Sequence, residues 1–328
     1  MKTAQVVFTG CCRAELVEHT ATLEPPEAHE VTGTTLATII SAGTELAVYQ
    51  GLAGGTFPAY PGYAAVFRVD RVGSQVKNFR PGDIAFCMGP HRSFQRAKEE
   101  HVVTVPPDIP PEQAVFARMM AVSMSTLTTT AARPPATVLV TGLGLVGHLA
   151  AQIFESCGYD VTAVDPLEAR RAIASASGIT RVCDSVPPEI TGSISLAVEC
   201  SGNERAVLDA CSSVRKGGEV VLVGVPWKKR TDLAAFDLLH AVFHRYVILR
   251  SGWEWEVPLL PTDFKQNSIY GNIAAALRWI GTGRVRMDGL YRLEPPERAA
   301  EAFSSLAAGT CDRLGIVFDW ERGSSGRW

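Results

Sequence analysis

The sequence predicts an α/β protein in which a doubly wound parallel sheet is joined to a β-rich part, and three observations support this. Short apolar strands alternate with helical segments between residues 121 and 254. A glycine-rich turn at 141–147 separates the first of these strands from the next helix. Residues 1–120 instead hold short β-type runs broken by turn signals, such as PGY at 61–63. The length of 328 residues also suggests about two domains.

The central segment is predicted to contain six strands with helices between them. The first strand, TVLVT at 137–141, is short, apolar and rich in β-branched residues, as expected for a strand buried on both faces. The expected strands are 137–141, 160–165, 181–183, 195–199, 219–224 and 246–250, and the expected helices cover about 146–157, 167–177, 204–214 and 233–243. This alternation predicts a doubly wound parallel-sheet domain over 121–254.

The C-terminal stretch holds two amphipathic helices, near 273–280 and 297–307, and a closing strand at 314–318. These elements are too few to form a domain alone. We therefore expect them to pack onto the N-terminal part, so that one domain comprises 1–120 and 255–328.

Composition excludes several classes of protein. The net charge is 31 − 34 = −3, which favours neither a nucleic-acid nor an anionic-membrane partner. No apolar run approaches the ~20 residues of a membrane span. The opening MKTAQVVFTG has the alternation of a strand and not of a signal peptide, so a soluble cytoplasmic protein is expected. The eight cysteines include no CxxC pair, and they are interpreted as packing thiols.

The turn at 141–147 carries the pattern GxGxxG. Gly142 is expected to allow the tight turn, Gly144 the approach of a pyrophosphate, and Gly147 close packing of helix on strand. Residues Leu143, Leu145 and Val146 complete this candidate cofactor site, because the helix N-terminus offers free N–H groups to phosphates. A nucleotide-free sheet with packing glycines is the alternative.

An acidic residue follows at the expected spacing. Asp165 ends the second strand, 23 residues after Gly142, where a carboxylate accepts hydrogen bonds from ribose hydroxyls. A 2′-phosphate there would meet like charge, so Asp165 favours NAD over NADP. Arg170, one turn into the next helix, is placed to contact the ribose edge or to soften that preference.

The chain as a whole resembles the medium-chain dehydrogenase/reductase superfamily. The matching segments are SAGTELAVYQG (41–51), PGY (61–63), PGDIAF (81–86), VTGLGLVG (140–147), VECSG (198–202), GGEVVLVGVP (217–226) and DRLGIVF (312–318). The resemblance implies a β-rich GroES-like catalytic domain, a Rossmann domain and an NAD(P)-dependent, alcohol dehydrogenase-like activity. The segments ISAGTE and PGY are most similar to alcohol-oxidising relatives such as the bacteriochlorophyllide hydroxyethyl dehydrogenases.

The zinc ligands of the family are replaced in this sequence. Where the zinc alcohol dehydrogenases have Cys-Gly-Thr/Ser-Asp, this chain has Ala42-Gly43-Thr44-Glu45, and where they have Gly-His-Glu, it has Gly62-Tyr63-Ala64. The four-cysteine lobe for structural zinc is also missing. Because a catalytic zinc needs three protein ligands, the resemblance implies a zinc-independent enzyme without a metal site.

Three residues are candidates for the oxygen-facing chemistry that zinc would otherwise perform. By resemblance, Thr44 matches the hydroxyl that begins the proton relay, and Tyr63 stands at the second metal-ligand position. His91 lies in the loop GPHRSF, which matches the family's loop at the mouth of the site, and its ring suits a proton shuttle. The alternatives are a turn-holding Thr44, a pocket-lining Tyr63 and a solvated loop His91.

Further residues are expected around the substrate and the cofactor. Arg92 and Arg118 are candidate anchors for an acidic substrate group, with surface salt bridges as the alternative. Trp253 is a candidate for stacking on a ring-shaped substrate, although dimer or hinge packing is favoured. By resemblance, Cys200, Val225 and Arg313 lie near the cofactor, with Cys200 interpreted as a packing thiol.

The leading hypothesis is an NAD-linked, zinc-independent dehydrogenase or ketoreductase acting on a small secondary alcohol or ketone, in specialised metabolism. One alternative is an enoyl- or quinone-type C=C reductase, since an enone needs less polarisation than a ketone. A second is a nucleotide-binding protein without net redox activity. The apolar edge strand 246–250 predicts a homodimer.

Overall fold

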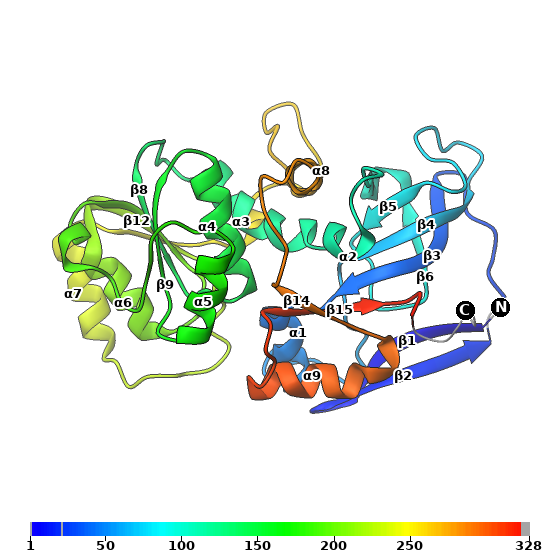
Figure 1. Cartoon of the computed structure of the whole chain (residues 1–328), viewed down its shortest axis with the longest axis horizontal. Helices are drawn as coiled ribbons and strands as arrows, with labels where there is room; N and C mark the ends of the chain where they lie inside the picture. Colours follow the sequence, from blue (N-terminus) through cyan, green and yellow to red (C-terminus); the bar gives the residue numbers. More distant parts are fainter. Residues whose placement is uncertain (1, 21, 323–328) are drawn as a thin grey trace. The chain divides into compact units, whose positions relative to one another are not determined.

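The structure is a computed structural model that describes residues 2–20 and 22–322. Its contacts divide the chain into two compact units (Figure 1). The first is formed by the described parts of Met1–Arg118, Ile273–Thr282 and Leu290–Trp328, and the second by Met119–Asn272 and Gly283–Gly289. Among the described residues, no helix has the length and apolar character needed to cross a membrane.

The second unit contains a six-stranded parallel sheet in the order β10-β9-β8-β11-β12-β13. Its strands are β8 (Thr137–Thr141), β9 (Asp160–Val164), β10 (Val182–Cys183), β11 (Ile194–Glu199), β12 (Val214–Leu222) and β13 (Ile248–Ser251). This order is that of a doubly wound Rossmann sheet, so the predicted fold class is confirmed.

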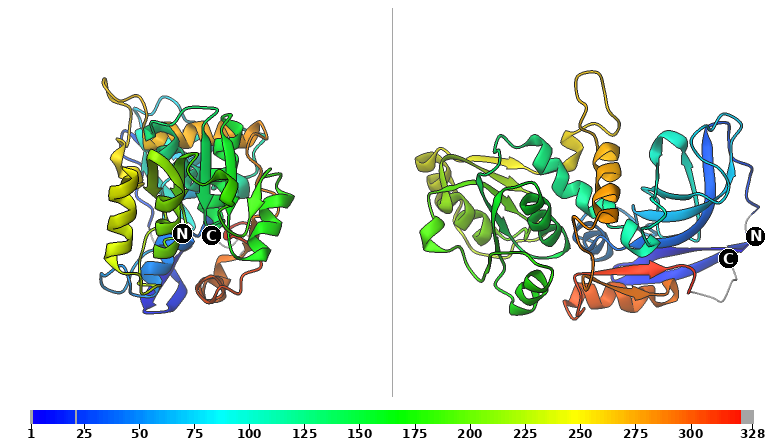
Figure 2. Two further views of the ribbon diagram at one scale, coloured as in Figure 1. Left: turned by 90° about the vertical axis from the view of Figure 1, so that its left-hand side faces the viewer. Right: turned by 45° about the horizontal axis from the view of Figure 1, so that its top comes forward.

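Helices cover both faces of this sheet, as Figures 1 and 2 show. Residues of α4 (Leu145–Ser156) and α5 (Glu168–Ala176) share one apolar core with β8, while residues of α6 (Glu204–Ser213) and α7 (Ala235–Arg245) share the other. The two cores leave no polar face for water, which explains why the strands are continuously apolar. Helix α3 (Ala117–Thr129), which the sequence did not predict, adds Leu127 to the first core.

The first unit is built on a seven-stranded, mostly antiparallel sheet. The order is β14-β15-β3-β4-β5-β7, with β6 also paired to β3. Its strands are β3 (Glu30–Ile39), β4 (Ala65–Val72), β5 (Ile84–Cys87), β6 (Phe94–Lys98), β7 (Val102–Thr104), β14 (Tyr291–Glu294) and β15 (Gly315–Asp319). Strands β1 (Lys2–Gly10) and β2 (Arg13–Thr20) form a separate hairpin.

The C-terminal segments complete this first unit, because β15 pairs with β3 and α9 (Ala299–Ala308) packs on β2 and α1 (Ala42–Tyr49). The remaining helices are α2 (Pro111–Ala114), α8 (Ile269–Gly281) and the short 3-10 turns η1 (Glu99–His101), η2 (Pro188–Ile190), η3 (Glu254–Glu256) and η4 (Pro296–Arg298). The contacts group 255–272 and 283–289 with the second unit, whereas the predicted boundaries had assigned them to the other domain.

Two element boundaries also differ from prediction. Strand β12 begins at Val214, before the KGG turn, because Ile194 pairs with Val214 ahead of a shift in register. Strand β13 begins at Ile248 instead of Tyr246, since Tyr246 adopts a left-handed conformation (φ 54°) that ends α7.

Candidate functional site

The glycine turn between β8 and α4 has the geometry of a phosphate-binding loop. Gly142 has a φ of +83°, and a Cβ on it would lie 2.7 Å from the backbone nitrogen of Ser201. A Cβ on Gly147 would lie 1.8 Å from the carbonyl oxygen of Gly142. A Cβ on Gly144, in contrast, would meet nothing within 4 Å. The first and third glycines are thus required by packing, whereas the second leaves open space at the turn.

The start of α4 fits an anionic group in that space. The helix begins at Leu145, and its N-cap residue Gly144 offers no side-chain hydrogen bond to the first N–H groups. Those donors and the helix dipole favour a phosphate. The described residues therefore fit the pyrophosphate of a dinucleotide, which the backbone of Gly144, Leu145 and Val146 would hold.

Asp165 makes bonds that the sequence did not predict. Its carboxylate accepts hydrogen bonds from the backbone N–H groups of Leu143 (2.8 Å) and Leu167 (2.9 Å), and Arg170 lies 3.3 Å away. Asp165 is only 1% exposed, whereas the Arg170 side chain is 43% exposed. In this structure Asp165 ties the glycine turn to the start of α5, and Arg170 is the more accessible of the two.

Glu199 organises the next loop and was missed by the sequence analysis. It ends β11 and accepts hydrogen bonds from the backbone N–H groups of Ser201 (2.7 Å) and Gly202 (3.1 Å), and from the Ser201 hydroxyl. Burial raises the pKa of Glu199, and these donors partly oppose the shift. The signal available in the sequence was an acidic residue directly before the SG turn in VECSG.

Cys200 and Val225, two predicted cofactor neighbours, flank this loop. A Cβ on Gly147 would approach the Cβ of Cys200 to 3.0 Å, so Cys200 packs against α4. Burial raises the pKa of the Cys200 thiol well above its ordinary value, which keeps it protonated. Val225 is half-exposed, and its carbonyl oxygen would lie 2.7 Å from a Cβ on Gly202.

In the first unit, Tyr63 lies beside two other hydroxyl groups. Helix α1 begins directly after Ser41 and carries Thr44 in its first turn. The Tyr63 hydroxyl donates a hydrogen bond to Ser41 Oγ and lies 3.5 Å from Thr44 Oγ1. The Arg118 guanidinium carbon stacks 4.6 Å above the centre of the Tyr63 ring. The structure thus brings together the predicted pair Tyr63 and Thr44 and adds Ser41, which the sequence analysis missed.

These contacts set the protonation of Tyr63. Burial raises the pKa of Tyr63 above its ordinary value near 10, while Arg118 and the two hydroxyls oppose the shift without cancelling it. Tyr63 is therefore a neutral phenol at neutral pH. Such a group is a hydrogen-bond donor and not a base.

His91 lies in the core of the first unit, contrary to the solvated-loop alternative. It is fully buried (0% exposed), and its ring packs edge-on against Phe318 at 5.2 Å between centroids. Its Nδ1 is 2.8 Å from Thr38 Oγ1, and its Nε2 is 2.9 Å from Glu45 Oε2. With both nitrogens engaged and no exposed surface, the expected contact of His91 with a substrate is not supported. The sequence spacing gave no sign of this burial.

The His91 network connects to the Tyr63 cluster through Glu45. Glu45, on α1, also accepts the backbone N–H of Ser41 at 2.8 Å. Thr38 Oγ1 accepts a hydrogen bond from Trp320 Nε1 at 3.0 Å. All groups are satisfied when neutral His91 donates from Nε2 to the Glu45 carboxylate and accepts the Thr38 hydroxyl proton at Nδ1. Glu45 is therefore the link that holds Ser41 beside Tyr63.

The other predicted substrate and cofactor residues lie in different environments. Arg118 is 3% exposed and stacks on the Tyr63 ring. It is therefore poorly placed to anchor a substrate that enters from solvent. Arg92 is half-buried with Nε lacking a hydrogen-bond partner, and burial lowers its pKa. Trp253 is 69% exposed in the second unit. Arg313 lies 3.7 Å from the neighbouring Asp312.

The donor set for zinc is incomplete at the matched positions. Ala42 and Tyr63 stand where the resemblance would place a thiolate and an imidazole. Across residues 2–20 and 22–322, no three His, Cys, Asp or Glu side chains converge as metal ligands would. The residues present therefore do not fit a catalytic zinc.

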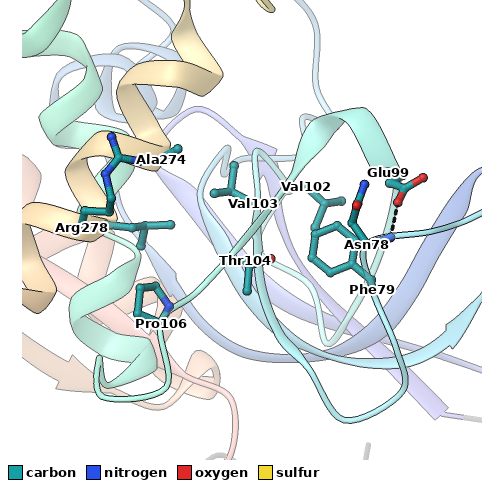
Figure 3. Close-up of a pocket in the computed structure, with 10 residues that line it drawn as sticks. Asn78, Phe79, Glu99, Val102, Val103, Thr104, Pro106, Ala274 and Arg278 are labelled. Atoms are coloured by element: carbon teal, nitrogen blue, oxygen red, sulfur yellow. Dashed lines mark hydrogen bonds between the residues drawn. The ribbon is translucent and has the colours of Figure 1, made fainter.

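A cavity of about 330 Å³ in the first unit lies apart from these residues (Figure 3). It is lined by Asn78, Phe79, Glu99, Val102, Val103, Thr104, Pro106, Ala274, Leu277 and Arg278. Glu99 accepts hydrogen bonds from the backbone N–H groups of Lys77 (2.9 Å) and Asn78 (2.7 Å), which lowers its pKa. The Glu99 carboxylate therefore stabilises the loop that contains Lys77 and Asn78. None of the predicted site residues lines this cavity.

Comparison with known proteins gives consistent results. Residues 146–258 match the zinc-binding dehydrogenase family. Two alcohol dehydrogenases from Geobacillus stearothermophilus are 26% identical over 146 residues and 25% identical over 210 residues, or 42% and 52% of this chain. The chain spans 43% and 62% of the lengths of these enzymes.

Solved structures resemble the whole chain. Galactitol-1-phosphate dehydrogenase from Escherichia coli superimposes with a TM-score of 0.82 at 18% identity, covering 96% of this chain and 99% of that one. Acetophenone reductase from Geotrichum candidum, solved in complex with NAD, gives 0.78 at 16% identity, covering 97% of each chain. At these identities the likeness is one of fold. The matched segments are thus similar to the zinc-binding dehydrogenase family and to alcohol dehydrogenases, and the fold is that of the solved structures compared.

Proposed function

We propose that this chain is a zinc-independent, NAD-linked oxidoreductase that interconverts a secondary alcohol and a ketone. Bound NAD would supply the hydride acceptor or donor. The observation that carries the proposal is the environment of Tyr63. This half-buried phenol has two hydroxyl neighbours, and it stands where the resemblance would place a metal ligand. The NAD complex of acetophenone reductase, a structural neighbour, supports both the cofactor and the substrate class.

Tyr63 would provide the polarisation that zinc provides in other family members. A carbonyl oxygen that receives a hydride at its carbon develops negative charge, and a phenolic O–H can donate to it. Because hydroxyl rotors reorient freely, Ser41 and Thr44 can donate to Tyr63 Oη when its own proton turns toward a substrate oxygen. Arg118, stacked on the ring, favours any negative charge that develops on the phenol.

The cofactor preference is proposed from Asp165 and its neighbours. A buried carboxylate beside the glycine turn disfavours the additional charge of a 2′-phosphate. Arg170 offers the opposite charge at the same edge, so the preference should be moderate. A titration in which NADPH bound more tightly than NADH would contradict the assignment to NAD.

The activity is tested with three variants of the full chain. Tyr63→Phe removes the donor and should lower turnover by about 10²–10³-fold while leaving NADH affinity nearly unchanged. Thr44→Val should give a smaller loss, since Ser41 remains. Tyr60→Phe is the matched control, because Tyr60 is an exposed tyrosine on the same segment.

The substrate panel should contain ketones, secondary alcohols and enones. Turnover of enones alone would replace the proposal with C=C reduction. Full activity of Tyr63→Phe on every substrate would show that the donor lies elsewhere. Elemental analysis that found one zinc per chain in active protein would contradict the metal-free chemistry.

We also propose that the second unit mediates a homodimer. Strand β13 is an edge strand, and Ile248 on it is exposed. Helix α7 carries three further exposed apolar side chains, Phe236, Leu239 and Phe243, of which Phe243 is 77% exposed. Residues 236, 239 and 243 follow the spacing of one helix face, and an exposed apolar face and an open strand edge both favour pairing.

A further inference from the structure

Two adjacent cysteines occupy the turn of the β1–β2 hairpin. Gly10 pairs with Arg13, so Cys11 and Cys12 are the two turn residues, and both are exposed. Their sulfur atoms are 3.8 Å apart. The other six cysteines are buried or half-buried. The hairpin tip therefore presents the most accessible thiols among the described residues.

The spacing of the two sulfurs suits a bridging atom better than a direct disulfide. Adjacent Cα atoms across a trans peptide are about 3.8 Å apart, below the roughly 4.4–6.8 Å of ordinary disulfides. A direct bond would therefore strain the turn. One atom that bonds both sulfurs holds them slightly closer than the observed 3.8 Å, a change that small side-chain rotations allow without moving the backbone.

The surroundings restrict what that bridging atom can be. No third His, Cys, Asp or Glu side chain completes a metal site in the described parts of the chain, so the atom must bring its other substituents. Desolvation, the hydrogen bond between the two thiols and the charge of Cys11 raise the pKa of the Cys12 thiol, so cations that require thiolates are disfavoured. A centre that exchanges an oxygen for two thiol sulfurs, releasing the thiol protons in water, and that carries its own third substituent fits both conditions.

The turn is also bonded to the helix that carries Thr44 and Glu45. Cys12 N–H donates to the carbonyl of Tyr49 at 2.7 Å, and Tyr49 Oη donates to the carbonyl of Cys12 at 3.0 Å. Tyr49 is the last residue of α1, and a Cβ on nearby Gly51 would lie 3.9 Å from the Cys11 sulfur. Cys12 itself has a φ of 56°, which is costly for a residue with a side chain. A change at the turn is thus transmitted directly to the end of α1.

We propose that Cys11 and Cys12 form a dithiol site for a monosubstituted trivalent arsenical, and that its occupation restrains helix α1. In this reaction the two As–O bonds of R–As=O are replaced by two As–S bonds. The oxygen leaves as water with the two thiol protons, and arsenic stays trivalent throughout. No oxidant or reductant is needed.

The capture is tested with phenylarsine oxide and the full chain, read by intact mass and peptide mapping. We expect one adduct per chain on residues 11 and 12, stable to excess monothiol and removed by a 1,2-dithiol. Cys11→Ser and Cys12→Ser each keep only one of the two thiols, so a single As–S bond would hold the arsenical. The affinity of the chain for the arsenical should then fall by about 10²–10⁴-fold. Cys311→Ser, which removes a half-buried lone thiol, should behave as the parent.

The coupling to α1 is tested by hydrogen exchange. Arsenical binding should slow amide exchange at 45–49 in the parent and in Cys311→Ser. Tyr49→Phe should capture the arsenical but show less of this slowing, because the hydroxyl bond to the Cys12 carbonyl is gone while the Cys12 N–H bond to the residue-49 carbonyl remains. An adduct that monothiols displace as readily from the parent as from Cys11→Ser would overturn the dithiol site. Unchanged exchange at 45–49 in a fully occupied parent would overturn the coupling.

Discussion

Replacing Glu45 by Gln isolates the contribution of one buried carboxylate to the first unit. Glu45 accepts two hydrogen bonds, from His91 Nε2 at 2.9 Å and from the Ser41 N–H at 2.8 Å. A glutamine amide has one oxygen and one NH₂ group, so it faces two donors with a single acceptor. The side chain keeps its size, and the change removes only acceptor capacity and charge.

His91 cannot restore the balance by exchanging its proton. If Nδ1 carried the hydrogen instead, it would donate to Thr38 Oγ1, which already accepts from Trp320 at 3.0 Å. The Thr38 hydroxyl would then lose the acceptor that Nδ1 now provides. Either arrangement leaves one buried donor unpaired, at a cost of about 1–3 kcal/mol. For a unit of this size that corresponds to a melting point lowered by roughly 2–12 °C.

Scanning calorimetry of the full chain and hydrogen exchange of the α1 peptides measure this effect. We expect the transition of the first unit to move down and the amides at 42–49 to exchange faster. Glu321→Gln is the control, since Glu321 forms an exposed ion pair with Arg68 and should cost little. If Glu45→Gln melted no lower than Glu321→Gln, the account of the His91 network would be wrong.

Three further predictions concern the second unit. Gly144→Ala should fold like the parent and bind NADH more weakly, because its Cβ enters the open space at the turn. Gly147→Ala should instead lower the melting point, because its Cβ would lie 1.8 Å from the Gly142 oxygen. Burial lowers the pKa of His148 to about 4 from an ordinary 6.5, so the unfolded chain binds this proton first as pH falls. Stability should therefore decrease from pH 6.5 to 4, by up to about 3 kcal/mol, and His148→Gln should flatten this slope in denaturant titrations. Phe243→Glu should halve the mass seen by light scattering if α7 covers a dimer interface.

Each of these has a distinct contrary result. If Gly144→Ala bound NADH as tightly as the parent, the cofactor phosphate would not bind at that turn. An unchanged pH slope in His148→Gln would assign the acid sensitivity to other groups. A parent protein with the mass of one chain would refute the dimer outright.

The parallel sheet could be predicted from sequence because its signals are local. Each strand is a short apolar run, each helix has its own periodicity, and GxGxxG marks the first crossover, so the strand order follows from a general rule. Boundaries were less accurate where one residue decides them. The left-handed Tyr246, for instance, ends α7 and delays β13 by two residues.

The polar network of the first unit could not be predicted, because its contacts join distant residues. His91 meets Thr38 and Glu45 across 53 and 46 positions, and Trp320 meets Thr38 across 282. Nothing in GPHRSF distinguishes a buried histidine from a solvated one. The pairing of Tyr63 with Thr44 was reachable only through the family resemblance, and the same resemblance gave no reason to examine Ser41.

The first unit is built from segments that are far apart in the sequence, and this affects how it folds during synthesis. Its β3 strand stays without one neighbour until β15 has left the ribosome, and His91 lacks Phe303 and Phe318 above it until then. The parallel sheet of the second unit, by contrast, is complete once residue 251 has emerged. At roughly 5–20 residues per second, the remaining stretch to Trp320 takes several seconds. During that interval the nascent chain exposes an unfinished apolar sheet, which is when a chaperone would be needed most.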